Sequence, residues 1–138
     1  WSMDNTVTDG NDNAVVKTIY DPCPAGFHMP ASNAFTGFTT NGQGNGPKNV
    51  SGAWDYGYNF NNKITSPDAA VYFPASGYRG SSHNDGSLNN VGVHGYYWSA
   101  VPYDGSDGCY LGFDSGYVHP QYYYYDRSFG FSVRPVSE

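Results

Sequence analysis

Tyrosine is the residue type whose number and spacing in this chain point most directly to a chemistry, that of molecular recognition. Nine of the 14 tyrosines fall between Tyr96 and Tyr125, and the series ends in four consecutive tyrosines, 122–125. A tyrosine offers a large, stiff, amphipathic contact surface with few torsions to fix, and binding loops combine it with small polar residues. Ser, Gly, Asp and His accompany the tyrosines here. The stretch is therefore predicted to form a binding surface.

Alternation within this stretch predicts which side chains pack and which are presented. Successive strand side chains point to opposite faces, so Leu111 and Phe113 share one face, and Tyr110, Gly112 and Asp114 share the other. A half-buried sheet whose wet face happens to be tyrosine-rich is the open alternative. Contiguous exposed aromatics favour an interaction site. The predicted ligand-binding residues are Tyr103, Asp104, Ser106, Asp107, Tyr110, Gly112, Asp114, Tyr117, His119, Tyr122, Tyr123, Tyr124, Tyr125 and Phe129.

Histidine and cysteine do not occur in a spacing that predicts catalysis. The four histidines have no Gly-x-Ser-x-Gly motif to join. Cys23 lies between two prolines, which is typical of a structural turn. We therefore predict that the domain is not an enzyme and that it needs no cofactor.

Two groups of aspartates carry the oxygen ligands that calcium prefers, but without the EF-hand pattern. They are Asp4, Asp9 and Asp12 near the start, and Asp104, Asp107 and Asp114 in the tyrosine-rich stretch. Solvated acidic loops are the favoured interpretation, and no metal site is predicted.

Composition and charge exclude several classes of partner. The formal charge is −6 and the pI is about 4.8, whereas a nucleic-acid surface needs clustered Lys and Arg. No apolar run is long enough to span a bilayer, so direct membrane insertion is not expected. A chain of 138 residues fits one domain, and residues 1–18 are expected to be a lead-in segment from a longer upstream chain. Cys23 and Cys109 permit one disulfide, and two unrelated thiols are the alternative.

The elements that must position these residues are expected to be short strands joined by loops. The chain has 18 glycines, nine prolines and a single Glu, a composition that favours little helix. A brief helix is predicted after Pro30, through about Phe38, a loop over 39–51, and a turn at Asn84-Asp85-Gly86. Residues 53–63 suit either a strand or an irregular loop. Strands are predicted over 15–20, 27–29, 69–73, 96–100, 109–113 and 129–136.

Four phrases in order carry a resemblance to a known family. They span Tyr20–Phe27, Phe73–Arg79, Gly95–Ser99 and Arg127–Val136. Together they resemble the Fibrobacter succinogenes major paralogous domain family of Bacteroidetes surface proteins, and the related variable proteins of diversity-generating retroelements. The resemblance runs from about Ile19 to the end. It implies an α+β, C-type-lectin-like fold with small antiparallel sheets, two short helices and extensive irregular loops. It also implies an extracellular location, on a bacterial cell surface or a phage particle.

The residue types agree with diversification of the kind that such retroelements perform. Mutating only the adenines of an AAC codon yields Tyr, His, Asp, Ser, Gly, Phe or Cys, the types that fill most of the predicted binding positions. No Asn follows Asn90, although Asn is abundant before it. The interleaved residues that act as scaffold in this interpretation are Trp98, Leu111, Phe113, Val118, Pro120, Phe131, Val133 and Pro135. A tyrosine-rich adhesin without a retroelement is the alternative.

These observations favour a monomeric display domain whose tyrosine-rich surface binds a protein or glycan on a cell surface. The alternative is a structural or assembly domain of a fimbrial or surface protein, in which the aromatic face contacts a neighbouring subunit. A display site predicts a monomer in solution, and a constitutive contact predicts stable oligomers.

Overall fold

The computed structural model describes residues 1–4, 6, 12–80 and 86–138, and these residues form strands and loops with one 3-10 turn, η1 (Thr36–Phe38). The strands are β1 (Phe27–His28), β2 (Val50–Ser51), β3 (Gly57–Asn61), β4 (Ala70–Pro74), β5 (Tyr78–Arg79), β6 (Leu88–Asn89), β7 (Gly95–Pro102), β8 (Asp107–Phe113), β9 (Val118–Asp126) and β10 (Val136–Ser137). No helix in the described part of the chain is long and apolar enough to cross a membrane.

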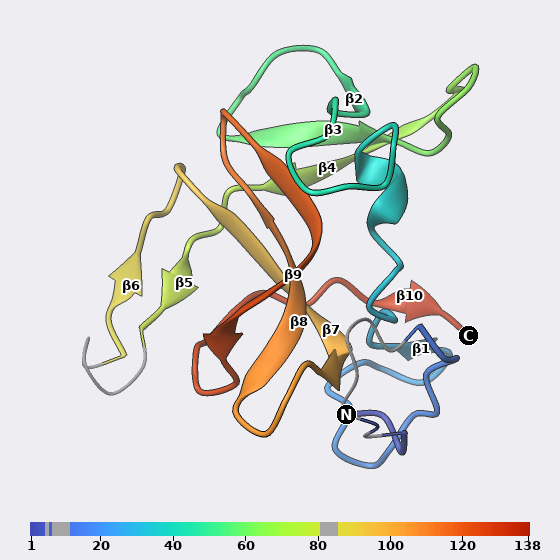
Figure 1. Ribbon diagram of the computed structural model, residues 1–138, viewed down its shortest axis with the longest axis vertical. Coiled ribbons are helices and arrows are strands. Elements are labelled where there is room, and N and C mark those ends of the chain that lie inside the picture. The colour runs from blue at the N-terminus through green and yellow to red at the C-terminus, as the bar shows by residue number, and fades with distance from the viewer. Residues whose placement is uncertain (5, 7–11, 81–85) are drawn as a thin grey trace.

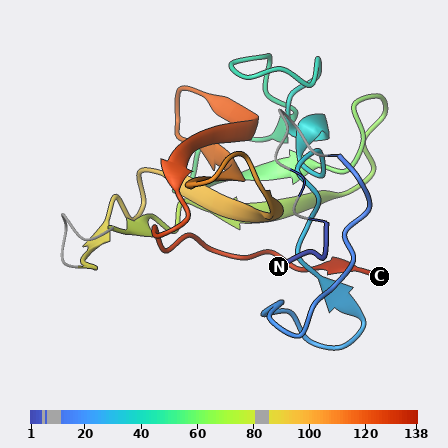
Figure 2. The same ribbon diagram turned by 60° about the horizontal axis from the view of Figure 1, so that its bottom comes forward.

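Four small antiparallel sheets make up the architecture: β1–β10, β2–β3–β4, β5–β6 and β7–β8–β9. The β7–β8–β9 sheet occupies the centre of the molecule, with β2–β3–β4 at the top of the view and the β5–β6 hairpin at one side (Figure 1). The two ends of the chain lie beside β1 and β10 (Figure 2). The tyrosine-rich stretch therefore belongs to the central sheet.

The predicted α+β, C-type-lectin-like fold with two short helices is wrong. The segment after Pro30 forms successive turns instead of a helix, with i→i+3 bonds from Ala34 N–H to the Ala31 carbonyl and from Phe38 N–H to the Phe35 carbonyl. The Ser32 hydroxyl in this segment donates to Asp12 and does not bond to a backbone N–H group as a helix cap would. Among the described residues only the η1 turn is helical, and the fold is built almost wholly from strands and loops.

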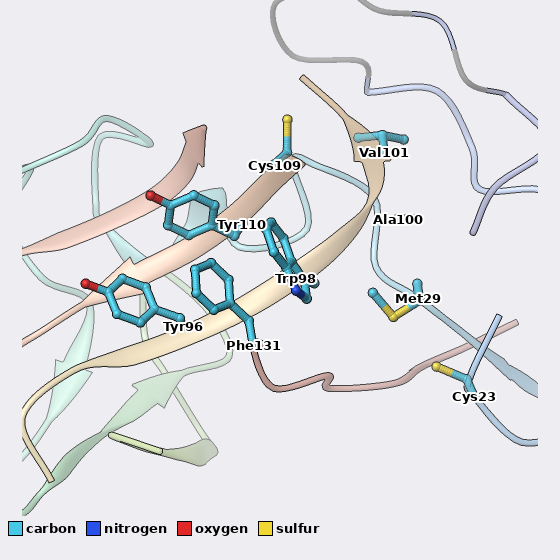
Figure 3. Close-up of a cluster of buried hydrophobic side chains, with 9 residues drawn as sticks. All are labelled: Cys23, Met29, Tyr96, Trp98, Ala100, Val101, Cys109, Tyr110 and Phe131. Carbon is cyan, nitrogen blue, oxygen red and sulfur yellow. The ribbon is translucent and has the colours of Figure 1, made fainter. Parts of the chain in front are cut away.

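Two aromatic cores lie on either side of the central sheet. Adjacent residues of β7 point to opposite faces, so Tyr96 and Trp98 enter the first core and Tyr97 enters the second. Phe131 stacks on both Tyr96 and Trp98, at ring centroid distances of 4.9 and 4.3 Å (Figure 3). The second core is centred on Phe60, which is fully buried among Phe38, Tyr58, Phe73 and Phe113. Aromatic rings thus supply the bulk that a leucine-poor chain lacks.

Several predicted elements are confirmed and others are wrong. The strands predicted over 27–29, 69–73, 96–100 and 109–113 correspond to β1, β4, β7 and β8, and residues 53–63 contain β3. The predicted strand over 15–20 is absent, with one bridge from Lys17 to Ser2 in its place. Residues 129–136 do not form one continuous strand: Gly130 and Ser132 form isolated bridges, and only Val136 belongs to a strand, β10. Of the turn predicted at Asn84-Asp85-Gly86, the first two residues lie outside the described residues, and Gly86 lies in a turn with a φ of 67°.

Both cysteines are buried, and the disulfide that the sequence permits is not formed. Their side chains belong to different parts of the first core (Figure 3). Near Cys23 the chain is held by Asp21, whose carboxylate accepts bonds from the backbone N–H groups of Cys23 (2.8 Å) and Met29 (3.0 Å). Burial opposes ionisation of Asp21, but these bonds and the charge of Lys17 bring its pKa below the ordinary value.

Candidate binding surface

The strand that carries the tyrosine run, β9, pairs with β8 through two bulges. Along β9 the residues His119, Tyr122 and Tyr125 lie opposite Gly112, Tyr110 and Gly108, so three residues of β9 match two of β8 at each step. Cross-strand partners share a face of a sheet, and a bulge adds one residue to one strand. His119, Tyr122 and Tyr125 therefore share one face at a spacing of three.

Tyr110 is not presented to solvent, and its predicted role in ligand contact is wrong. Its side chain is 1% exposed and packs edge-on against Trp98 and Phe131 in the first core. The hydroxyl group is also buried, without a hydrogen-bond partner of normal geometry in the described part of the chain. Burial, followed by the neighbouring Tyr125 and Tyr122, raises the pKa of this phenol, although the Tyr124 backbone opposes the shift.

Gly112 is buried as well and serves the packing of the sheet. A Cβ at this position would lie 3.2 Å from the Tyr110 ring and 3.5 Å from the Tyr96 ring. The two rings thus close over the glycine, and Gly112 is not available to a ligand.

The predicted residues at Tyr125 and Phe129 also turn towards the protein. Their rings contact each other at 4.8 Å, and both pack against Phe131 and Tyr78. The hydroxyls of Tyr117 and Tyr125 lie beside that of Tyr96 and, after burial itself, raise the pKa of Tyr96. A cluster of interacting phenols therefore lies under the surface of the sheet.

Six of the predicted residues form one continuous series of ring contacts, which we call the aromatic strip: Tyr103, Tyr123, Tyr124, Tyr122, His119 and Tyr117. At one end Tyr103 and Tyr123 are stacked, with centroids 4.1 Å apart and planes 12° from parallel. Tyr124 contacts Tyr123 at 5.0 Å and Tyr122 at 5.1 Å, and it is 66% exposed. The other five rings are half-buried, so the strip presents its outer parts to solvent.

At the other end of the strip, His119 stacks on Tyr122 at 4.2 Å and meets Tyr117 at 5.1 Å. A Cβ on Gly44 would lie 2.3 Å from His119 Nδ1, so the 41–46 loop covers the imidazole directly. Burial lowers the pKa of His119. Gly44 could not be assigned to the site from sequence, because it lies 75 positions before His119.

The side chains of Asp104, Ser106 and Asp114, three of the predicted polar residues, form hydrogen bonds within turns. Asp104 Oδ1 accepts bonds from the N–H groups of Ser106 and Asp107, each at 2.7 Å, and from the Ser106 hydroxyl. Arg127 donates to the carbonyls of Gly105 and Ser106 and closes the same turn. These bonds hold the β7–β8 turn that carries Tyr103.

Asp114 holds the following turn in the same way. Its Oδ1 accepts bonds from the N–H groups of Gly116 (2.6 Å) and Tyr117 (3.0 Å), and its Oδ2 lies 3.6 Å from His94 Nε2. In the described part of the chain no three His, Cys, Asp or Glu side chains converge as metal ligands.

Asp107 and Asp126 form an acidic pair at the Tyr103 end of the strip. They are direct cross-strand partners on β8 and β9. Burial, and then the charges of Asp104 and Asp126, raise the pKa of Asp107. Sequence reasoning included Asp107 but missed Asp126, although Asp126 follows the tyrosine run directly.

Comparison with known proteins gives one match. A comparison with the curated proteins and with the solved structures finds no match. The profile of one protein family matches residues 48–136, which include β2 to β9 and the whole aromatic strip. The chain therefore belongs to the family described as a domain of unknown function (DUF8237).

Proposed function

We propose that this chain is a ligand-binding display domain whose aromatic strip contacts a protein or glycan target. The observation that carries the proposal is the continuity of six aromatic rings along β9 and its adjoining turns, with Tyr124 largely exposed. Tyrosine is enriched among the residues that dominate binding energy, since its ring buries much area and its hydroxyl can pair.

The frame behind the strip supports this proposal because it is built from other residues. Both cores are filled by rings such as Trp98, Phe60 and Phe113, and the turns are held by carboxylates and by Arg127. Tyr103 and Tyr122 pack against the first core, whereas Tyr123 and Tyr124 do not belong to either core. A ligand could therefore meet a strip whose shape is fixed before binding, which reduces the entropy lost on association.

The location and origin of the domain are part of the proposal. Four ordered sequence motifs support a surface position on a bacterial cell or phage particle. The absence of Asn after Asn90 supports diversification of the strip by a retroelement. A near-copy of the C-terminal codons, rich in Asn and beside a reverse transcriptase gene, is the expected genomic feature.

The test compares binding by the domain with binding by the double variant Tyr123→Ala/Tyr124→Ala. A phage-displayed random peptide library and a glycan array serve as probes. We expect peptides or glycans captured by the unchanged domain to bind the variant about 30-fold more weakly or worse, since loss of two hot-spot rings costs about 2 kcal/mol or more. The melting temperature should change little.

The matched control is Tyr20→Ala, which removes a 77% exposed tyrosine outside the strip and should leave binding unchanged. Equal binding by the Tyr123→Ala/Tyr124→Ala variant would refute the proposal. Stable oligomers of the unchanged domain that dissociate in this variant would instead support an assembly contact.

A further inference from the structure

The positive charges of this chain are already engaged by the chain itself. Each of the six Lys and Arg residues contacts an acceptor or an aromatic ring. Lys17 donates to the carbonyls of Cys23, Pro24 and Phe27, Lys48 donates to the Tyr58 hydroxyl and the Ser115 carbonyl, and Lys63 donates to the Asp68 carboxylate. Arg79 donates to the Gly86 carbonyl, Arg127 donates to the carbonyls of Gly105 and Ser106, and Arg134 lies over the Phe73 ring. The formal charge of the chain is −6. Its surfaces therefore favour a partner that brings positive charge.

Negative charge is concentrated at the Tyr103 end of the aromatic strip. Asp107 and Asp126 oppose each other across two strands, and Asp104 lies in the same turn. Like charges placed directly opposite on a sheet repel. Arg127 also lies beside them, but three carboxylates outnumber one guanidinium.

Strand alternation puts Asp126 on the same side of β9 as Tyr124, the most exposed member of the strip. Tyr125 packs inward against Tyr78 and Phe131. Because neighbouring strand residues point to opposite faces, Tyr124 and Asp126 both point away from that packing. Both side chains are exposed. The most exposed ring of the strip and an exposed carboxylate are thus two residues apart.

The opposite end of the strip has a different electrostatic character. There Asp114 is held by two backbone N–H groups and by His94, and Lys48 donates to the neighbouring Ser115 carbonyl. The strip therefore has an acidic end at Tyr103, whereas at the Tyr117 end the negative charge of Asp114 is balanced by nearby donors and by Lys48.

We propose that the aromatic strip binds a peptide segment of a partner protein through a Lys or Arg side chain that docks at the acidic end, between Asp126, Asp107 and the Tyr103–Tyr123 pair. This inference rests on the proposed function and names the partner class. Ammonium and guanidinium groups pair with carboxylates and donate hydrogen bonds to a phenol oxygen. The remainder of the segment contacts the rings from Tyr124 towards Tyr117.

A peptide is favoured over a glycan because much of the flat ring surface is already used within the protein. Tyr103 and Tyr123 cover each other, and so do His119 and Tyr122. Sugar rings stack on open aromatic faces, and within the strip only Tyr124 is largely exposed. The uncompensated carboxylates give no advantage with a neutral glycan and repel an anionic one.

The experiment begins with dodecapeptides selected from the phage-displayed library on the immobilised domain. We expect enrichment of Lys and Arg among the selected sequences. The tightest synthetic peptide, labelled with fluorescein, is then measured by anisotropy against the double variant Asp107→Asn/Asp126→Asn. Affinity should fall about ten-fold at low salt, and its dependence on salt should weaken, since screened charge pairs contribute to binding at low ionic strength.

Folding of this variant is not at risk, because the substitutions remove a repulsion between neighbours, and its melting temperature verifies this. Asp55→Asn is the matched control, since Asp55 is an exposed carboxylate outside the strip. A peptide analogue with citrulline or acetyl-lysine in place of the cation should lose the same factor.

The outcomes separate this inference from the proposed function. Neutral or acidic peptides that require Tyr123 and Tyr124 but bind Asp107→Asn/Asp126→Asn unchanged overturn the cationic anchor and leave the binding domain intact. Glycans that bind where no peptide does overturn the partner class alone. Absence of any binder that depends on Tyr123 and Tyr124 overturns both proposals.

Discussion

Close approach between aromatic rings and glycines governs packing at the scale of single residues. Gly95 on β7 lies opposite Phe113 on β8, and a Cβ at residue 95 would lie 2.2 Å from the Phe113 ring. Phe113 is fully buried, and its ring contacts both Tyr97 and Phe60. The ring therefore has little space into which it can withdraw.

Gly95→Ala should destabilise the domain by about 1–3 kcal/mol, the usual cost of adding a methyl group to a packed core. Urea unfolding followed by tryptophan fluorescence measures the change in the free energy of unfolding. Gly105→Ala is the control, because no atom lies within 4 Å of a Cβ built at residue 105. Equal stability of the two variants would show that the core around Phe113 yields more easily than the structure indicates.

Tyr110 illustrates what alternation along a strand can and cannot reveal. The pattern correctly separated Tyr110 from Leu111 and Phe113. Tyr110 lies in the first core, and the other two residues lie in the second. It could not distinguish a solvent-facing side from a second buried side, because an aromatic residue suits both. The error arose because Trp98 and Phe131, from distant parts of the chain, pack over the Tyr110 side of β8.

At the scale of elements, the long strands β7 and β8 were predicted from their apolar residues, whereas the long strand β9 and the two-residue strands β2, β5 and β6 were not. β7 and β8 were located to within a few residues. β9 was not predicted as a strand because its two bulges put His119, Tyr122 and Tyr125 on one face at a spacing of three. The same bulges divide the tyrosine run: Tyr125 packs against Tyr78 and Phe131, whereas the preceding Tyr124 is largely exposed.

The segment 21–29 depends on one carboxylate for its shape. Asp21 accepts two backbone N–H bonds, and its folded-state pKa lies below the ordinary value of 3.8. A depressed carboxyl pKa stabilises the folded state above the unfolded pKa, and this contribution is lost as the pH falls through the folded pKa.

Asp21→Asn should therefore lower the free energy of unfolding by about 1.5–3 kcal/mol near neutral pH, the value of hydrogen bonds to a charged group. The difference from the unchanged protein should shrink as the pH falls below 3.8. Urea unfolding at about pH 7 and about pH 3 tests this sign. Asp55→Asn is again the control, and a difference that grows in acid would contradict the assignment.

At the scale of the whole molecule, two cores share one central sheet without a covalent cross-link. Cys23 and Cys109 are 7% and 1% exposed. Burial, and then the hydrogen bond and charge of Asp21, raise the pKa of Cys23 to about 11. Thiol chemistry therefore reports on the integrity of the fold, because a buried and protonated thiol reacts slowly.

Both thiols should react with dithiobis-nitrobenzoate far more slowly in the native protein than in urea, at about pH 8. Two thiols per chain should become reactive in the same transition that exposes the tryptophans. Rapid reaction of one thiol in native buffer would show that its part of the first core opens independently. An unreactive pair in urea would show a disulfide after all.

The overall architecture was harder to predict than the site. Composition correctly indicated little helix, whereas the two short helices came from resemblance and are wrong. Of the predicted contact residues, the structure joins Tyr103, Tyr117, His119 and Tyr122–Tyr124 in one strip. It assigns Asp104 and Asp114 to turns and buries Tyr110, a division that depends on contacts between distant segments.

The bulges of β9 have a further consequence for solubility. β9 stands at the margin of its sheet, where a long, flat, tyrosine-rich strand would template the addition of further copies into fibrils. Two inserted residues distort the ladder, Pro120 removes an amide donor, and Asn45 N–H occupies the Val118 carbonyl. The irregularity that hid this strand from sequence reasoning thus opposes its pairing with the same strand of a second copy.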